Sequence, residues 1–215
     1  MISTGIAGLD KLLGGGIAPG LVTDIFGPAG SGKTQLALQI CANAIGKKII
    51  YQDTTGSFRP ERMLQIMRAR GIPEGLLENM IVARVTNTAE QARGLDRIRE
   101  VGPGLLVVDN VSDLFSFEYS RESSSLARHV MFMEYMHSLS MCCIKNRIPA
   151  VITNVVRRYG EQERENLERS VSMFTHRKVR LSRQGARVIA EVLPSFGGRR
   201  EVSYEITEGG LVGAG

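Results

Sequence analysis

Few cysteines, no long apolar run and no leader-like start set the first limits on this chain. The three cysteines, Cys41, Cys142 and Cys143, are odd in number and have neither CxxC nor zinc-ligand spacing. We therefore expect buried, reduced thiols in a cytoplasmic protein, not a disulfide framework or a zinc site. No segment approaches the ~18 uninterrupted apolar residues of a membrane span. Residues 1–10 lack the basic-then-apolar order of a signal peptide, so no membrane role is expected.

The composition is that of an ordinary globular protein with an uneven distribution of charge. The 215 residues, 43% hydrophobic and 23% charged, suit one soluble domain spanning residues 1–215 with a single core. The net charge is +5, and residues 157–200 alone hold 11 Lys and Arg against 5 acidic residues. A basic excess confined to one late segment indicates a polyanionic partner.

Short apolar runs alternate with segments of helical spacing along most of the chain. The alternation predicts strands at 20–26, 47–53, 79–85, 104–109 and 149–154, and helices at 34–46, 60–71, 88–101 and 125–146. From Met173 the period changes, which predicts antiparallel strands at 173–182, 186–193 and 201–207. The order indicates an α/β fold, with a mainly parallel central sheet flanked by helices and a C-terminal antiparallel extension.

A glycine-rich turn is the clearest functional signal. The residues "GPAGSGKT" at 27–34 match G-x-x-x-x-G-K-[ST] between a predicted strand and a predicted helix. In this P-loop pattern the backbone N–H groups and the positive end of the helix surround phosphate oxygens. Lys33 can reach the outer phosphates, and the Thr34 hydroxyl can bind Mg²⁺. The expected nucleotide-binding residues are Gly27, Pro28, Ala29, Gly30, Ser31, Gly32, Lys33, Thr34 and Gln35.

Asp109 ends the apolar run "LLVVD" and is the second part of the predicted site. A carboxylate at the carboxyl end of a buried strand, beside a phosphate loop, is well placed to help hold Mg²⁺. The pattern therefore predicts binding of ATP with Mg²⁺ through Thr34 and Asp109. Hydrolysis is a separate question.

Several segments together resemble the ATPase core of the RecA/RadA recombinase family. They are "STGIAGLDKLLGGGIAPGLVTDIFGPAGSGKTQLALQ", "DTTGSFRPERM", "LLVVDNVSDLF", "AVITNVV" and the ending "YEITEGGL". The resemblance covers essentially the whole chain and implies a RecA-like P-loop NTPase core. Because the N-terminal helical DNA-binding domain and the polymerisation linker of the family have no counterpart here, the sequence is most similar to archaeal RadB-type recombinase paralogues.

The resemblance also implies a function, cofactors and partners. It implies a recombination accessory protein that uses ATP and Mg²⁺, binds DNA, with the single-stranded form expected, and meets a RadA-type recombinase or another repair protein. An oligomer is compatible with it, but a long filament of this chain alone is not expected. The KaiC-like branch shares the P-loop, but the "FRPER" and "ITEGG" segments fit that branch less well.

The sequence departs from the family pattern at residues that handle the terminal phosphate. The resemblance puts a catalytic glutamate at Thr55 and a phosphate-sensing glutamine at Val155, and neither side chain here can replace it. Asp53 is a weak substitute, because a strand would place it roughly 6–7 Å from Thr55. Glu118 is an alternative carboxylate. The family's inter-subunit "DSP" cap corresponds to "LPS" at 193–195. No catalytic residue is therefore assigned, and hydrolysis is expected to be slow or absent.

The resemblance implies further contacts to the base and to DNA. Arg62, in "FRPER", matches the arginine that stacks on adenine, although an ordinary solvated helix arginine is the alternative. The loops after the strands ending at Asp109 and Asn154 match the DNA-facing loops. Their candidate DNA-binding residues are Arg121, Arg128, Arg157, Arg158 and Tyr159. Interleaved glutamates make a salt-bridged helix the alternative for the second loop. His176 is expected to be structural.

Three other functions compete with the accessory role. One is an active DNA-dependent ATPase that exchanges strands, against which Thr55 and Val155 stand. Another is a KaiC-like signalling ATPase without a DNA role, which salt-sensitive DNA binding would exclude. The third is a protein adaptor with a vestigial P-loop, which nucleotide-dependent stabilisation lost in Lys33→Ala would exclude.

Overall fold

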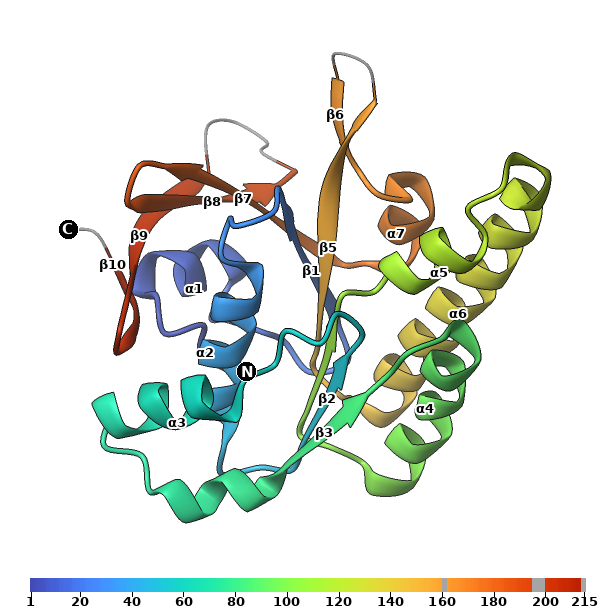
Figure 1. Cartoon of the computed structure of the whole chain (residues 1–215). Coiled ribbons are helices and arrows are strands. Elements are labelled where there is room, and N and C mark those ends of the chain that lie inside the picture. Colours follow the sequence, from blue (N-terminus) through green and yellow to red (C-terminus); the bar gives the residue numbers. More distant parts are fainter. Residues whose placement is uncertain (160–161, 195–199, 214–215) are drawn as a thin grey trace.

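The computed structural model describes residues 1–159, 162–194 and 200–213 (Figure 1). Its strands form one sheet in the order β10-β9-β8-β7-β1-β5-β4-β2-β3, and β6 pairs with β5. The strands from β3 to β7 along this order are parallel, whereas β7, β8, β9 and β10 are antiparallel neighbours. The predicted α/β fold with a mainly parallel sheet and an antiparallel C-terminal extension is confirmed.

The strands have the following bounds: β1 Val22–Gly27, β2 Ile49–Asp53, β3 Met80–Arg84, β4 Leu105–Asp109, β5 Ala150–Tyr159, β6 Gln162–Glu165, β7 Arg177–Gln184, β8 Arg187–Leu193, β9 Glu201–Thr207 and β10 Gly210–Gly213. The helices are α1 Ala7–Leu13, α2 Lys33–Ala44, α3 Pro60–Ala69, α4 Thr88–Val101, α5 Asp113–Glu118, α6 Ser125–Asn146 and α7 Glu168–Phe174. Two short 3-10 helices, η1 Glu74–Asn79 and η2 Glu122–Ser124, complete the described elements.

The helices cover the sheet in two layers, with a hydrophobic core under each layer (Figure 1). Because successive strand residues point to opposite faces, each central strand serves both cores. Leu105 and Val107 of β4 pack in the core with α1, α2 and α3, whereas Leu106 and Val108 pack in the core with α4, α5, α6 and α7. Odd-numbered residues of β2, β4 and β5 therefore face α2, the helix that follows the P-loop.

The second half of β5 departs from the sequence expectation. The strand continues past Asn154 to Tyr159 and pairs with β6 as an antiparallel hairpin, with Arg158 opposite Glu163. The alternative of a salt-bridged helix is wrong at this place, because residues 156–159 and 162–165 pair as two antiparallel strands. The chain then forms α7, so the strand expected from Met173 begins only at Arg177.

Smaller differences arise where local patterns were short. The segment 110–124, expected as a loop, contains α5 and η2, and α1 and β10 were not predicted. His176 lies just before β7, where its N–H bonds the Val22 carbonyl and its Nδ1 accepts from the Val22 N–H at 3.1 Å. The imidazole thus anchors the start of β1, as expected of a structural histidine.

The three cysteines are buried and free, as expected. Within the described part of the chain, no helix has both the length and the apolar character required to cross a bilayer.

Candidate nucleotide and nucleic-acid sites

The carboxyl ends of the parallel strands bring the predicted site together at one edge of the sheet. In the strand register Asp53 of β2 stands beside Asp109 of β4, and Gly27 of β1 stands beside Val155 of β5. Asp109 and Thr153 are odd-numbered and lie on the α2 side of the sheet. Ligands of open parallel sheets usually bind at such an edge.

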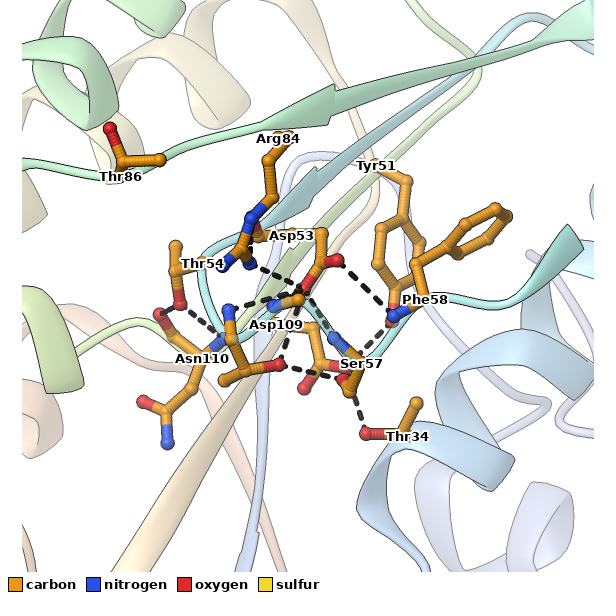
Figure 2. A network of polar contacts seen from close by, with 12 residues as sticks. Thr34, Tyr51, Asp53, Thr54, Ser57, Phe58, Arg84, Thr86, Asp109 and Asn110 are labelled. Carbon is orange, nitrogen blue, oxygen red and sulfur yellow. Dashed lines mark hydrogen bonds and ion pairs between the residues drawn. The ribbon is translucent and has the colours of Figure 1, made fainter.

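The carboxylate of Asp109 accepts from three hydroxyl groups. Figure 2 labels two of the donors, Thr34 and Tyr51. Its Oδ2 accepts from Thr34 Oγ1 at 2.8 Å and from the Tyr51 hydroxyl at 2.7 Å. Its Oδ1 accepts a short bond from Thr153 Oγ1. Burial and the nearby carboxylate raise the pKa of Tyr51, so this phenol remains a proton donor.

The pair Thr34 and Asp109 fits a Mg²⁺-phosphate site. A hydroxyl at the start of α2 and a carboxylate 2.8 Å away supply the two protein ligands that Mg²⁺ commonly uses beside phosphate oxygens and water. The described residues hold no cluster of three or more His, Cys, Asp or Glu that would form a cage made by protein alone. The predicted metal ligands are therefore brought together in a set that suits a phosphate-bound ion.

The P-loop packs tightly against β7 and β9, which explains two of its glycines. A Cβ atom on Gly27 would lie 2.3 Å from the Leu181 carbonyl oxygen. Gly32 has φ of +94°, and a Cβ there would lie 2.9 Å from Ile206 Cδ1. A side chain at Gly27 would clash with the β7 backbone, and at Gly32 the positive φ favours glycine.

Lys33 has its ammonium inside the curl of the loop. Its Nζ donates to the carbonyl oxygens of Gly27 at 2.9 Å and Pro28 at 2.8 Å. Burial lowers the pKa of Lys33, an effect partly opposed by Asp109 and Asp113. A phosphate group would replace neutral carbonyl acceptors with anionic ones, which favours the charged ammonium.

A pocket of about 630 Å³ lies over the loop and the start of α2. Six of the predicted residues line it, which are Gly30, Gly32, Lys33, Thr34, Gln35 and Arg62. Arg62 on α3 is fixed at the far end, where Nε donates to Gln35 Oε1 at 2.8 Å and Nη2 donates to the Thr207 carbonyl at 2.8 Å. Nη1 donates to the Glu208 carbonyl at 2.6 Å. The guanidinium is thus a rigid plane at the pocket wall, a suitable stacking surface for a base.

Four further lining residues were not predicted as site residues, namely Arg183, Ile206, Thr207 and Glu208. They come from the antiparallel extension, which folds back beside the P-loop. In the sequence, the "YEITEGGL" segment carries only a family likeness, and no local pattern places it near the phosphates. Tyr51 was also missed, although a tyrosine within a buried strand signals a hidden partner for its hydroxyl.

The carboxylate of Asp53 accepts hydrogen bonds from the turn that follows β2 (Figure 2). It accepts from the backbone N–H groups of Thr55, Gly56, Ser57 and Phe58 at 2.8–3.2 Å. It also accepts from Thr55 Oγ1 at 3.2 Å, so the two side chains are in contact, whereas a continuing strand was expected to keep them apart. The reason is that β2 ends at Asp53 and the chain curls around the carboxylate.

Glu118 and Val155 are the two other residues considered for handling the terminal phosphate. Glu118, the alternative catalytic carboxylate, accepts from the Thr88 N–H at 2.7 Å and from the Thr88 hydroxyl at 2.5 Å, at the start of α4. Val155 lies beside Gly27, next to the P-loop. In the segment 193–195, Ser195 lies outside the described residues, so the expected loss of the inter-subunit cap is not tested.

The candidate DNA-binding residues lie on two neighbouring segments. Arg157 and Arg158 are exposed on the β5–β6 hairpin, and Arg157 Nη2 is 3.0 Å from Asp113 Oδ1 of α5. Tyr159 ends β5, but its side chain lies outside the described part. Arg121 is exposed before η2.

Arg128 of α6 lines a pocket of about 340 Å³ beside the hairpin base, and within the described part of the chain its buried Nε has no hydrogen-bond partner. His129, Arg164 and Arg169 line the same pocket together with Glu165 and Glu168, so its charge is mixed.

Comparisons with known proteins extend over most of the chain. Residues 1–211 match the Rad51 family. The "DNA repair and recombination protein RadB" of Thermococcus kodakarensis is 36% identical over 162 residues, which cover 73% of this chain and 70% of that protein. The protein of the same name from Thermococcus onnurineus is 34% identical, covering 76% and 73%. The "DNA repair and recombination protein RadA" of Cenarchaeum symbiosum is 34% identical, covering 73% of this chain but only 42% of its own length.

Proposed function

Because the chain belongs to the Rad51 family, we propose that it is an ATP- and DNA-binding accessory protein of homologous recombination and DNA repair. In this role it assists a RadA-type recombinase or another repair protein and hydrolyses ATP slowly or not at all. The names of the RadB relatives support the recombination role, and their alignment covers about 70% of their length. The mediator role is the finer part of the proposal.

Binding of ATP with Mg²⁺ is supported by the arrangement of the P-loop. Lys33 lies in the curl of the loop, Thr34 contacts Asp109, and Arg62 forms a fixed plane at the other end of the pocket. These groups suit the phosphates, the metal and the base of one nucleotide. The Mg²⁺ would neutralise phosphate charge, and the chain itself would orient the nucleotide.

The observation that carries slow hydrolysis is the engagement of the nearby carboxylates. Thr55 holds the position expected of a catalytic glutamate, and its hydroxyl has no basicity near neutral pH. Asp53 accepts from four backbone N–H groups of its own turn, and Glu118 is bonded to Thr88. Val155 offers no polar group to a terminal phosphate. Without a positioned base, turnover should fall by about 10²–10⁴-fold.

Binding of DNA is supported by the arginines of the hairpin and of the pocket at its base. Arg157 and Arg158 lie at the carboxyl end of β5, just past Val155, which pairs with Gly27 of the P-loop, and Arg128 lies on α6. Guanidinium groups grip phosphates with two parallel hydrogen bonds, so the affinity should fall steeply with salt.

A strand-exchange assay tests the proposal. The chain is added in increasing amounts to a RadA-type recombinase with single-stranded DNA, homologous duplex and ATP, and a parallel series contains the chain alone. We expect more exchanged product with the recombinase and none from the chain alone. Lys33→Ala and Arg157→Ala/Arg158→Ala should each reduce the stimulation. Exchange by the chain alone, or the absence of both stimulation and DNA binding, would contradict the proposal.

A further inference from the structure

We propose that Arg183 is an additional phosphate-binding residue, which contacts the phosphate chain of a bound nucleoside di- or triphosphate from β7 of the same subunit. The inference rests on the proposed nucleotide binding and adds a cation that lies outside the P-loop pattern. Three observations carry it, namely the parity of β7, the packing of β7 and β8 against the loop, and the charge of the pocket.

Side chains alternate between the two faces of β7, and this alternation places Arg183 on the P-loop side of the sheet. Val179 and Leu181 belong to the core shared with α2 and α3. Arg183 is the next residue of the same parity, so it leaves the sheet on that face. Arg180 and Ser182 have the opposite parity and line a separate pocket. The strand thus turns one arginine to the nucleotide side and another away from it.

The end of β7 lies directly beside the phosphate loop. The Leu181 carbonyl would be only 2.3 Å from a Cβ on Gly27, where the loop begins. Val188, the β8 partner of Arg183, has its Cγ2 3.9 Å from the corresponding position on Gly32, where the loop ends. Arg183 therefore starts from backbone that flanks the loop, and its side chain lines the pocket with Gly30, Gly32 and Lys33.

The charged residues that line the pocket carry a net positive charge, which favours an anionic ligand. Three cations, Lys33, Arg62 and Arg183, line it with a single carboxylate, Glu208. The guanidinium N–H groups of Arg62 donate to acceptors within the protein. Arg183 is different, since Nε donates to the Gly185 carbonyl at 3.0 Å and, among the described residues, neither Nη atom donates to an acceptor. The one bond orients the guanidinium and leaves the two Nη groups for phosphate oxygens.

Calorimetric titration with Mg-ADP and with a non-hydrolysable Mg-ATP analogue tests the proposal. Arg183→Gln should weaken both nucleotides by about 5- to 10-fold, as expected for one charge-assisted contact at a partly exposed site. The dependence of log Kd on log salt should also become shallower. Arg183→Lys keeps the charge but loses the two-pronged guanidinium geometry. Its affinity for both nucleotides should lie between those of the natural chain and Arg183→Gln.

Arg180→Gln is the matched control, because it removes the same charge from the opposite face of the same strand. It should bind both nucleotides within about twofold of the natural chain, since a distant exposed charge contributes little. Equal affinities for Arg183→Gln and Arg180→Gln would overturn the proposal. If Lys33→Ala still abolished binding in that case, the proposed binding of nucleotide at the P-loop would hold without the contact from Arg183. A natural chain that binds neither nucleotide would overturn both this proposal and the proposed function.

Discussion

Asp53 and Asp109 stand side by side in the strand register, yet their hydrogen-bond donors give them different roles. Asp109 accepts from hydroxyl groups, which can rotate or exchange when a metal ion arrives. Asp53 accepts from the backbone of its own turn, and these bonds cannot be released without refolding the turn. At the residue scale, the type of donor decides which carboxylate is free to take part in chemistry.

The hydroxyl of Tyr51 should matter for stability because it serves a buried charge. Tyr51→Phe removes one donor to Asp109 and should cost about 1.5–3 kcal/mol, the range for hydrogen bonds to charged groups. For a chain of this size the loss corresponds to a fall in Tm of about 3–12 °C. Thermal unfolding measures it.

Tyr204→Phe is the control for that experiment, since the Tyr204 hydroxyl is also buried but has no hydrogen-bond partner among the residues that the structure describes. Its removal should leave Tm unchanged or slightly raised. Equal losses in the two variants would show that the bond to Asp109 contributes nothing special.

Lys33 should decide whether nucleotide stabilises the fold. At a concentration 100 times Kd, a ligand adds about 2.7 kcal/mol, or roughly 5–10 °C in Tm for a chain of this size. Lys33→Ala should abolish this shift with Mg-ATP, whereas Lys48→Ala, an exposed residue beyond α2, should keep it. A shift of full size in Lys33→Ala would rule out the P-loop as the binding site.

At the scale of elements, three ionisable groups join β1, β6 and β7 behind the hairpin. Lys178 bonds closely to Glu165 and lies 3.4 Å from Asp24 Oδ2. Asp24 is wholly buried. Burial raises the pKa of Asp24 well above its usual value, Glu165 adds to the rise, and Lys178 opposes it.

This cluster predicts a pH dependence of stability with a definite sign. Because the folded pKa of Asp24 is raised, the fold holds a proton that the unfolded chain releases. The resulting stability is present below the unfolded pKa and is lost as pH rises through the folded pKa. Asp24→Asn cannot lose the proton, so its Tm relative to the natural chain should increase with pH. The exposed Asp96→Asn is the control, and a constant difference for Asp24→Asn would contradict the prediction.

The β5–β6 hairpin should carry part of the DNA affinity. Arg157→Ala/Arg158→Ala should weaken binding to single-stranded DNA and reduce the slope of log K against log salt by about 0.7 for each phosphate that the variant no longer binds. Fluorescence anisotropy at several salt concentrations measures both effects. Arg93→Ala/Arg97→Ala, which removes two exposed charges from α4, should leave the slope unchanged. An unchanged slope in the hairpin variant would place the DNA elsewhere.

At the scale of the whole molecule, the sheet explains which parts of the site could be predicted from sequence. The P-loop and Asp109 are local signals, because each follows directly from a strand and its next few residues. Arg183 and Ile206 reach the pocket only because the antiparallel extension folds back beside the loop, and no local pattern contains that information. The end of β2 at Asp53 could not be predicted from a local pattern either. The chain curls there, so Asp53 and Thr55 are in contact where a continuing strand was expected.

The hairpin shows a second limit of sequence patterns. Arginines and glutamates that alternate along residues 157–165 suit both a salt-bridged helix and a pair of strands. Contacts across the ends of the segment favour the strands, since Asn154 Nδ2 donates to Glu165 Oε1 and to the Asn166 carbonyl. These bonds close the base of the hairpin.

The central claim is that the site grips ATP without activating water, and paired measurements of binding and turnover test it most directly. Mg-ATP affinity and the steady-state rate are measured on the natural chain, Lys33→Ala and Thr55→Glu, with and without single-stranded DNA. We expect Lys33-dependent binding, turnover far below the ~10 s⁻¹ typical of enzymes, and a faster rate in Thr55→Glu. Turnover near ~10 s⁻¹ by the natural chain with DNA would contradict the account.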